Sequence, residues 1–234
     1  MDTLLNQRRQ MFNPGLQMCA NVMEFARAAA LRRQARIATL GPCGTSSEYV
    51  ASCFSRNMEL AESRPSLYAS YEEAAESVIG GENDLLLVAN AYANINRFYI
   101  SETLSLTTLF VLDTPSYGLA SLIPLEELMR KDEVVISTHP APAHLAKSFM
   151  SGFQGEIKIE VALSTSEAAR RAASREVDAC ITNDQARALH GLDFISPVRP
   201  IQMVWSVFKN RGDMSFPNFN SLPGILENEI RTHN

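Results

Sequence analysis

The sequence predicts an α/β fold, and three observations indicate it. From residue 36 onward, short apolar runs alternate with segments of helical periodicity. Capping-box spacing, a Ser or Thr three residues before a Glu, opens predicted helices at Thr45, Ser70 and Ser164. The 234 residues are 46% apolar and 20% charged, which is typical of a globular protein with one large domain or two smaller lobes. Alternating strands and helices favour a mostly parallel sheet covered on both faces.

The first 36 residues differ from the rest in charge. They hold six arginines and two carboxylates, a net charge of +4, so the remainder of this −5 chain carries −9. Within them Met18, Val22, Phe25 and Ala29 recur at the spacing of an amphipathic helix. A basic amphipathic helix can lie on a membrane, but docking on its own domain or on a second subunit is the favoured interpretation.

Short apolar or β-branched runs predict the strands. The first, residues 36–40, ends in a Gly-Pro-Cys-Gly turn. The remaining predicted strands are residues 85–88, 106–112, 134–137, 157–163, 179–182 and 203–208.

Start and stop residues predict the helices between these strands. One helix runs from Thr45 to Phe54, and one follows Ser70 and ends at a Gly-Gly pair. Further helices are expected at residues 142–150, after Ser164, and at residues 183–190 with Gly191 as the C-cap.

Composition excludes several classes of protein. The net charge of −5 predicts no whole-protein attraction to nucleic acid or anionic lipid. The longest apolar run, Leu85 to Ala89, is too short to span a membrane, and the first 20 residues hold no continuous hydrophobic core of an export signal. The four cysteines form no CxxC pair, so we expect reduced thiols, no metal site and a cytoplasmic protein.

Four predicted strands run directly into helix starts rich in Ser and Thr. Ligands of open α/β sheets bind beyond the carboxyl ends of the strands, where helix N-termini attract anions. A crevice for a small polyanion such as a dicarboxylate is therefore expected, although Ser and Thr are also the ordinary capping residues of any helix. The four starts are 45–47, 137–140, 164–166 and 182–183.

Most other catalytic patterns are missing from the sequence, including GxSxG, HExxH, the P-loop and GxGxxG. His139 precedes a proline at a helix start, where it can act in acid–base chemistry or as a cap. Tyr92, Arg97 and Tyr99 follow the strand at residues 85–88 and can bind a ring and a carboxylate, or serve as core and rim. His144 is expected to be a surface or packing residue.

Several segments, in order, resemble motifs of prephenate dehydratase catalytic domains. Residues 36–49 resemble the strand and GPxGT(F/Y)S opening, 137–140 the SHPxAL segment, 164–169 the STxxAA segment, and 188–192 the AxxYGL segment. The resemblance covers residues 36 to about 208 and implies two α/β lobes, like those of type II periplasmic binding proteins, with substrate between them. It implies lobe one at residues 36–113 plus 198–210, lobe two at 114–197, an N-terminal helical extension at 1–35, and a tail at 211–234 without an ACT domain.

The departures from that family point to a different reaction. Met203 stands about where the dehydratases carry the threonine of Thr-Arg-Phe, which helps to expel the ring hydroxyl, and Asn90-Ala91-Tyr92 replaces Glu-Asn-Ser. Residues 40–49, 91–99, 113–120, 137–142, 182–187 and 203–206 instead resemble non-aromatising prephenate decarboxylases of bacilysin- and aeruginosin-type pathways. Cys43, where a glutamate is usual, is a deviation within a loop.

This resemblance implies decarboxylation of prephenate without aromatisation, giving a dihydro-4-hydroxyphenylpyruvate for a secondary-metabolite pathway. No metal or organic cofactor is needed, and a homodimer is possible. Loss of a general acid, worth about 10²–10⁴ in rate, slows loss of the hydroxyl. The alternatives are a diverged dehydratase that makes phenylpyruvate and a two-lobed ligand-binding module without turnover.

The resemblance also assigns roles to residues, and it leaves the donor of the ring proton open between water, the substrate's own carboxyl group and a side chain. The catalytic candidates are Thr45, Ser46 and His139. The substrate-binding candidates are Ser47, Tyr92, Arg97, Tyr99, Ser137, Thr138, Ser164, Thr165, Thr182, Asn183, Met203 and Trp205.

Overall fold

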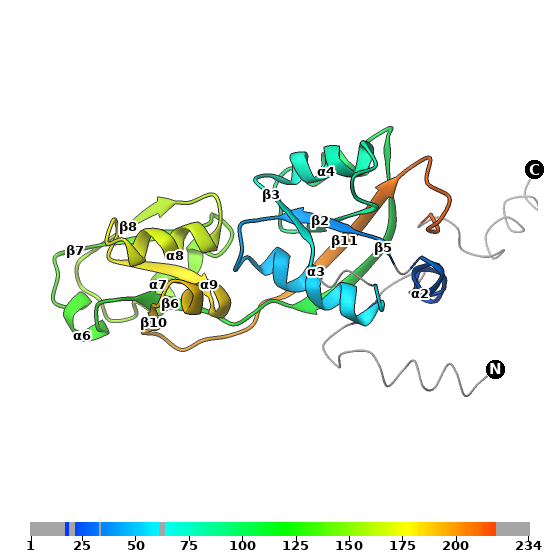
Figure 1. Ribbon diagram of the computed structural model, residues 1–234. Helices are drawn as coiled ribbons and strands as arrows, with labels where there is room; N and C mark the ends of the chain where they lie inside the picture. Colours follow the sequence, from blue (N-terminus) through cyan, green and yellow to red (C-terminus); the bar gives the residue numbers. More distant parts are fainter. Residues whose placement is uncertain (1–16, 19–21, 33, 61–63, 219–234) are drawn as a thin grey trace, which may run out of the picture.

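The computed structural model describes residues 17–18, 22–32, 34–60 and 64–218, which form two lobes, each built on one sheet (Figure 1). The sheet of lobe one has the order β1 (Gln17–Met18), β5 (Leu104–Asp113), β11 (Gln202–Asn210), β4 (Leu85–Ala89), β2 (Ile37–Leu40) and β3 (Ser66–Tyr68). The sheet of lobe two has the order β10 (Asp193–Phe194), β6 (Tyr117–Ser121), β9 (Ala179–Asn183), β7 (Glu133–Thr138) and β8 (Glu156–Val161).

The prediction of a mostly parallel sheet is wrong. Only β4, β2 and β3 in lobe one, and β9, β7 and β8 in lobe two, are mutually parallel; the other pairs among the described strands are antiparallel. The reason in lobe one is the return of β11 between β4 and β5, where Trp205 pairs with both Ala89 and Phe110. The predicted strands otherwise form close to their expected bounds, whereas β1, β3, β6 and β10 were not predicted.

Helices cover both faces of the sheet in lobe one. They are α2 (Val22–Leu31), α3 (Ser46–Asn57), α4 (Tyr71–Ile79) and α5 (Asn96–Tyr99). Leu85 and Leu87 of β4 pack in the cluster that contains residues of α2 and α3, while Leu86 and Val88 pack in the cluster with α4. Alternate side chains of a strand point to opposite faces, so the unbroken apolar run of β4 is explained by burial on both.

The helices of lobe two are short. They are α6 (Leu125–Leu128), the 3-10 helix η1 (Ala143–Leu145), α7 (Ala146–Phe149), α8 (Thr165–Ala173) and α9 (Asp184–Leu189). The expected helix at residues 142–150 is thus a 3-10 turn followed by one α-helical turn. All three predicted capping boxes form their side-chain cap: the hydroxyls of Thr45, Ser70 and Ser164 each accept a hydrogen bond from the amide three residues later.

The N-terminal helix α2 docks on lobe one. Phe25 and Ala29 are fully buried, and the Phe25 ring lies 5.5 Å from that of Phe54 and 5.2 Å from that of Phe216. The preceding residues add β1 to the edge of the sheet, antiparallel to β5, so the extension contributes a strand as well as a helix. No helix among the described residues is long and apolar enough to cross a membrane.

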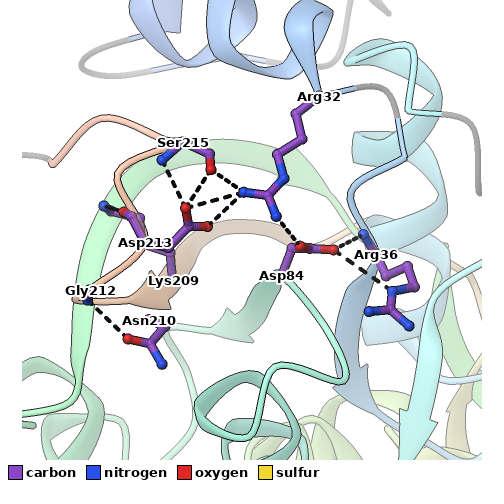
Figure 2. Close-up of polar contacts among 8 residues, drawn as sticks. All are labelled: Arg32, Arg36, Asp84, Lys209, Asn210, Gly212, Asp213 and Ser215. Carbon is purple, nitrogen blue, oxygen red and sulfur yellow. Dashed lines mark hydrogen bonds and ion pairs between the residues drawn. The ribbon is translucent and has the colours of Figure 1, made fainter.

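A cluster of polar side chains lies next to the end of α2 in lobe one (Figure 2). Arg32, just after α2, pairs with Asp84 at 3.1 Å and with Asp213 at 3.2 Å. The buried ammonium of Lys209 in β11 donates to the backbone carbonyl of Asp213. The cluster therefore joins α2, the turn before β4 and the segment after β11.

Two segments connect the lobes, residues 113–117 and 194–202 (Figure 1). They are bonded to each other: the amide of Thr114 donates to the carbonyl of Ile201 at 2.9 Å, and that of Tyr117 to the carbonyl of Arg199 at 2.7 Å. The lobes also meet where the loop before α3 contacts lobe two, because Ser166 donates to the carbonyl of Cys43 at 2.8 Å.

Candidate active site

A cavity of about 280 Å³ lies between the two lobes. Lobe one supplies the start of α3, the end of β4 and the start of β11, and lobe two supplies the loop after β7 and the first turn of α8. The described residues that form its wall include no Asp, Glu, Lys or Arg. Polar contacts with a ligand there come from hydroxyls, imidazoles and backbone amides.

Nine of the fifteen residues proposed from the sequence form part of this wall. These nine come from both lobes, and the other six candidates lie outside the wall. The nine are Thr45, Ser46, Ser47, Tyr92, His139, Ser164, Thr165, Met203 and Trp205.

Two helix N-termini open at the cavity. The hydroxyl of Thr45 accepts from the amide of Glu48 at 3.2 Å, and that of Ser164 accepts from the amide of Glu167 at 3.0 Å. The caps therefore occupy the third amide of α3 and of α8. The first two amides of each helix have no acceptor within the helix, and such groups at the positive end of the helix dipole bind carboxylates.

The two serines that begin α3 are each bonded to a tyrosine of the wall. Ser46 Oγ lies 2.7 Å from Tyr117 Oη, and Ser47 Oγ lies 2.8 Å from Tyr71 Oη. Tyr71 also accepts from the amide of Ala89 at 3.2 Å, so its own proton is available to Ser47. Burial raises the pKa of Tyr71 to about 12, and the phenol is therefore neutral at physiological pH.

Asn183 lies outside the wall and links the lobes behind it. Its side-chain nitrogen donates to the carbonyl of Gly44 at 3.0 Å and to Ser46 Oγ at 3.3 Å. Its side-chain oxygen caps α9 by accepting from the amide of Ala186 at 2.9 Å.

Three further candidates are fully buried and bonded within lobe two. Thr138 donates to the carbonyl of Ile181 at 3.1 Å, and Thr182 donates to that of Thr165 at 2.8 Å. Ser137 accepts from Arg171 at 3.3 Å. These contacts position the strand ends and the start of α8 rather than the cavity surface.

Arg97 and Tyr99 also lie outside the wall. Arg97 is exposed and pairs with Glu72 at 2.7 Å, and the same carboxylate accepts from the wall residue Tyr92 at 2.8 Å. Burial alone would raise the pKa of Glu72, but the hydrogen bonds from Tyr92 and Arg97 leave it below its usual value. Tyr99 is bonded to Ser206 at 2.6 Å.

Among the described wall residues that were not candidates, three have titratable side chains: Tyr71, Tyr117 and His144. Tyr117 belongs to residues 113–120, which resemble a decarboxylase motif, so that motif could have identified it as a site residue. Tyr71 follows the cap Ser70, and nothing in the sequence indicates that its ring reaches α3. His144 enters the wall because η1 follows directly after the loop that holds His139.

No protein-family model matches the chain, but individual proteins do. The prephenate decarboxylase of Bacillus subtilis (strain 168) is 35% identical over 198 residues, which are 82% of this chain and 94% of that protein. The prephenate decarboxylase of Planktothrix agardhii is 34% identical over 75% of this chain and 88% of its own.

Among solved structures, a prephenate dehydratase from Arthrobacter aurescens superposes with a TM-score of 0.61 at 16% identity. The superposition covers 78% of this chain and 62% of the dehydratase, and it shows a shared fold. The two decarboxylases share more than 30% identity with this chain over at least three quarters of its length, compared with 16% for the dehydratase. The protein therefore belongs to the prephenate decarboxylase family.

Proposed function

We propose that the protein is a carboxy-lyase that removes CO₂ from prephenate without aromatising the ring, giving a dihydro-4-hydroxyphenylpyruvate. The relatives named prephenate decarboxylase support the reaction. The structural observation that carries the proposal is the polarity of the cavity. Hydroxyls and amides gather at the starts of α3 and α8, whereas β11 presents Met203 and Trp205.

This polarity suits a substrate with two carboxylates and a ring. The amides of Ser46 and Ser47, and those of Thr165 and Ser166, are placed to bind carboxylate oxygens without a cationic side chain. Because the described wall residues include no Lys or Arg, the departing carboxylate is poorly solvated, and its loss as neutral CO₂ relieves that cost.

The β11 side of the wall withholds acid catalysis from the ring hydroxyl. Met203 has no proton to give, and the indole N–H of Trp205 is directed at the carbonyl of Leu112 at 3.4 Å. Hydroxide is a poor leaving group unless it is protonated, so the ring keeps its hydroxyl.

For the residues named from the sequence we propose roles adjusted to their places in the structure. Thr45, Ser46, Ser47, Ser164 and Thr165 hold carboxylates. Tyr92, His139, Met203 and Trp205 contact the ring, while Asn183, Ser137, Thr138 and Thr182 act from behind the wall, and Arg97 acts through Glu72 on Tyr92. Tyr99 is proposed as a peripheral contact.

We further propose lobe boundaries at residues 36–113 plus 198–210 and at 114–197, with terminal extensions at 1–35 and 211–234. A cytoplasmic location, a role in making a secondary metabolite and assembly as a homodimer complete the proposal. The described strands of the second sheet all come from residues 117–194, which supports the division. Mass in solution of the full chain and of a chain lacking residues 1–35 tests the dimer.

The reaction is tested by mixing purified protein with prephenate and following products by NMR and mass spectrometry. Loss of CO₂ alone, with the hydroxyl and a non-aromatic ring retained, is the expected result. Phenylpyruvate as the product would instead identify a dehydratase. Binding without turnover would identify a ligand-binding module.

A further inference from the structure

The donor of the ring proton can be sought among the titratable side chains of the cavity wall. The described part of the wall holds three tyrosines and two histidines. Tyr71 is bonded to Ser47, Tyr117 to Ser46, and Tyr92 to Glu72. The single polar atom of each phenol is therefore already bonded within the protein, whereas an imidazole has two ring nitrogens, which leaves His139 and His144.

Both imidazoles are bonded to one residue, Ala141, through its two backbone groups. The amide N–H of Ala141 donates to Nδ1 of His139 at 3.2 Å. The carbonyl oxygen of Ala141 lies 3.0 Å from Nδ1 of His144. Ala141 stands between Pro140 and Pro142, neither of which has an N–H, so it provides the amide donor of this tripeptide.

These two bonds require opposite tautomers. Nδ1 of His139 accepts a hydrogen bond, so the ring carries its proton on Nε2. A carbonyl oxygen accepts only, so Nδ1 of His144 carries a proton and its Nε2 has the lone pair. The two rings of one cavity thus offer a donor and an acceptor nitrogen, respectively.

The two rings also differ in what a second proton would do. A proton on Nδ1 of His139 would bring two N–H groups against each other, and burial of this half-buried ring independently lowers its pKa. A proton on Nε2 of His144 leaves its bond to the Ala141 carbonyl intact. His144 is exposed to solvent, so it can exchange protons with water.

We propose that His139 is a neutral Nε2–H donor to the bound substrate and that His144 carries the proton that is delivered to the ring, both set in these roles by Ala141. This inference rests on the decarboxylation proposed above. When the bond between the quaternary carbon and the carboxylate breaks, its electron pair spreads over the ring diene. A terminal carbon of that dienyl anion takes the proton from Nε2 of the His144 imidazolium, the hydroxyl stays, and His144 regains one proton from solvent. The net change is one proton consumed and one CO₂ released.

The tautomers are tested without any substrate. The chain has four histidines, and long-range ¹H–¹⁵N spectra distinguish Nδ1–H from Nε2–H imidazoles. Signals are assigned by their loss in His139→Asn and His144→Asn. We expect an Nε2–H spectrum for His139 and an Nδ1–H or doubly protonated spectrum for His144. The same neutral tautomer in both rings would overturn the proposal.

The roles of His139 and His144 are tested by Asn and Gln variants, whose side-chain amides take the place of one ring nitrogen each. The amide of Asn lies near Nδ1 and that of Gln near Nε2, so His139→Gln should keep more of kcat/KM than His139→Asn. An amide can donate a hydrogen bond but cannot act as a general acid at neutral pH, so His144→Gln should lower kcat by about 10²–10⁴. Added imidazole should restore part of this loss. In D₂O, the deuterium that the variant adds to the ring carbon should be distributed over both faces of the ring. His190→Asn, at the C-cap of α9, is the control and should keep wild-type kcat.

The two proposals fail in different ways. If wild-type protein releases CO₂ from prephenate and His144→Gln does so within twofold of it, the assignment to His144 is wrong and the decarboxylase remains. If wild-type protein releases no CO₂, the proposed function is wrong and both histidine roles fall with it. The His139 signal in the spectrum of His144→Gln shows whether that variant is folded.

Discussion

Ser46 Oγ and Tyr117 Oη lie 2.7 Å apart, and this hydrogen bond joins the first turn of α3 in lobe one to the first residue of β6 in lobe two. Both side chains form part of the cavity wall. Asn183, the last residue of β9, reinforces the same contact by donating to Ser46. The geometry of the cavity therefore depends on how closely the lobes approach at the start of α3.

Tyr117→Phe removes this bond without changing the ring. The free energy of unfolding should fall by about 1 kcal/mol, and kcat/KM for prephenate by up to about tenfold, because the Ser46 hydroxyl loses an orienting partner. Urea titration and initial rates measure the two effects. The matched variant is Tyr68→Phe, which removes an acceptor of Asn83 Nδ2 at 2.8 Å outside this cavity and should cost stability alone. An equal loss of kcat/KM in both variants would contradict this explanation.

Gly44→Ala tests the approach of the lobes by adding a single carbon. Gly44 has φ +83°, and a Cβ there would lie 3.3 Å from both the Cα of Ala186 and the Oγ of Ser166, across the lobe boundary. Gly81 has φ +80° with nothing within 4 Å of its Cβ position, so Gly81→Ala carries only the backbone cost of about 1–2 kcal/mol. Denaturant unfolding should show a larger loss for Gly44→Ala, and only this variant should raise KM. Equal losses would mean that the lobes do not meet at this loop.

Met203→Thr places a hydroxyl in the wall where the dehydratases are expected to have theirs. A share of the product should become phenylpyruvate, because the ring hydroxyl gains a proton donor. Met203→Val has nearly the same shape as Met203→Thr without the hydroxyl and should produce none. NMR of the product mixture gives the ratio for each variant. Phenylpyruvate from the Val variant, or none from the Thr variant, would show that acid catalysis at this position does not decide the outcome.

Acid sensitivity should involve the cluster at Arg32. Burial alone would raise the pKa of Asp213, but hydrogen bonds from Ser215 and the charges of Arg32 and Lys209 hold it below its usual value. A carboxyl whose pKa is depressed on folding stabilises the protein above its unfolded pKa, about 3.9, and this contribution is lost as the pH falls through the folded pKa.

Asp213→Asn should therefore be less stable than wild type at neutral pH, and the difference should shrink as the pH is lowered below about 4. Urea unfolding across that range measures it. Asp193→Asn changes an exposed carboxyl of β10 and is the control. A constant difference between wild type and Asp213→Asn at all pH values would exclude the carboxylate's charge as the cause.

Features set by neighbouring residues could be predicted from the sequence. The caps at Thr45 and Ser164 depend on residues three positions apart, and both form as expected. Strand β6 was missed because Gly118 suggests a turn. In the fold Gly118 is buried, and a Cβ there would come within 2.8 Å of the Phe194 ring, so close packing explains the glycine. The antiparallel pairing of β11 depends on partners that are about a hundred residues away in the chain, which no local pattern encodes.

Local sequence patterns also do not determine which side chains face the cavity. His139 forms part of the wall while its neighbour Thr138 faces the interior of lobe two, because successive side chains at a strand end point in opposite directions. A list of polar residues at a strand end therefore includes residues that face away from the cavity. Tyr71 and His144 were missed because their positions in the wall depend on how separate elements pack.

The place of β11 in the first sheet has a consequence for synthesis of the protein. This strand lies between β5 and β4, yet it is made after all of lobe two. While the chain emerges from the ribosome, lobe two can complete its sheet, whereas lobe one still has two separate groups of strands with open edges between them. Lobe one, and with it the cavity, is finished only when residues 202–210 insert, so chains terminated before that point cannot form the site.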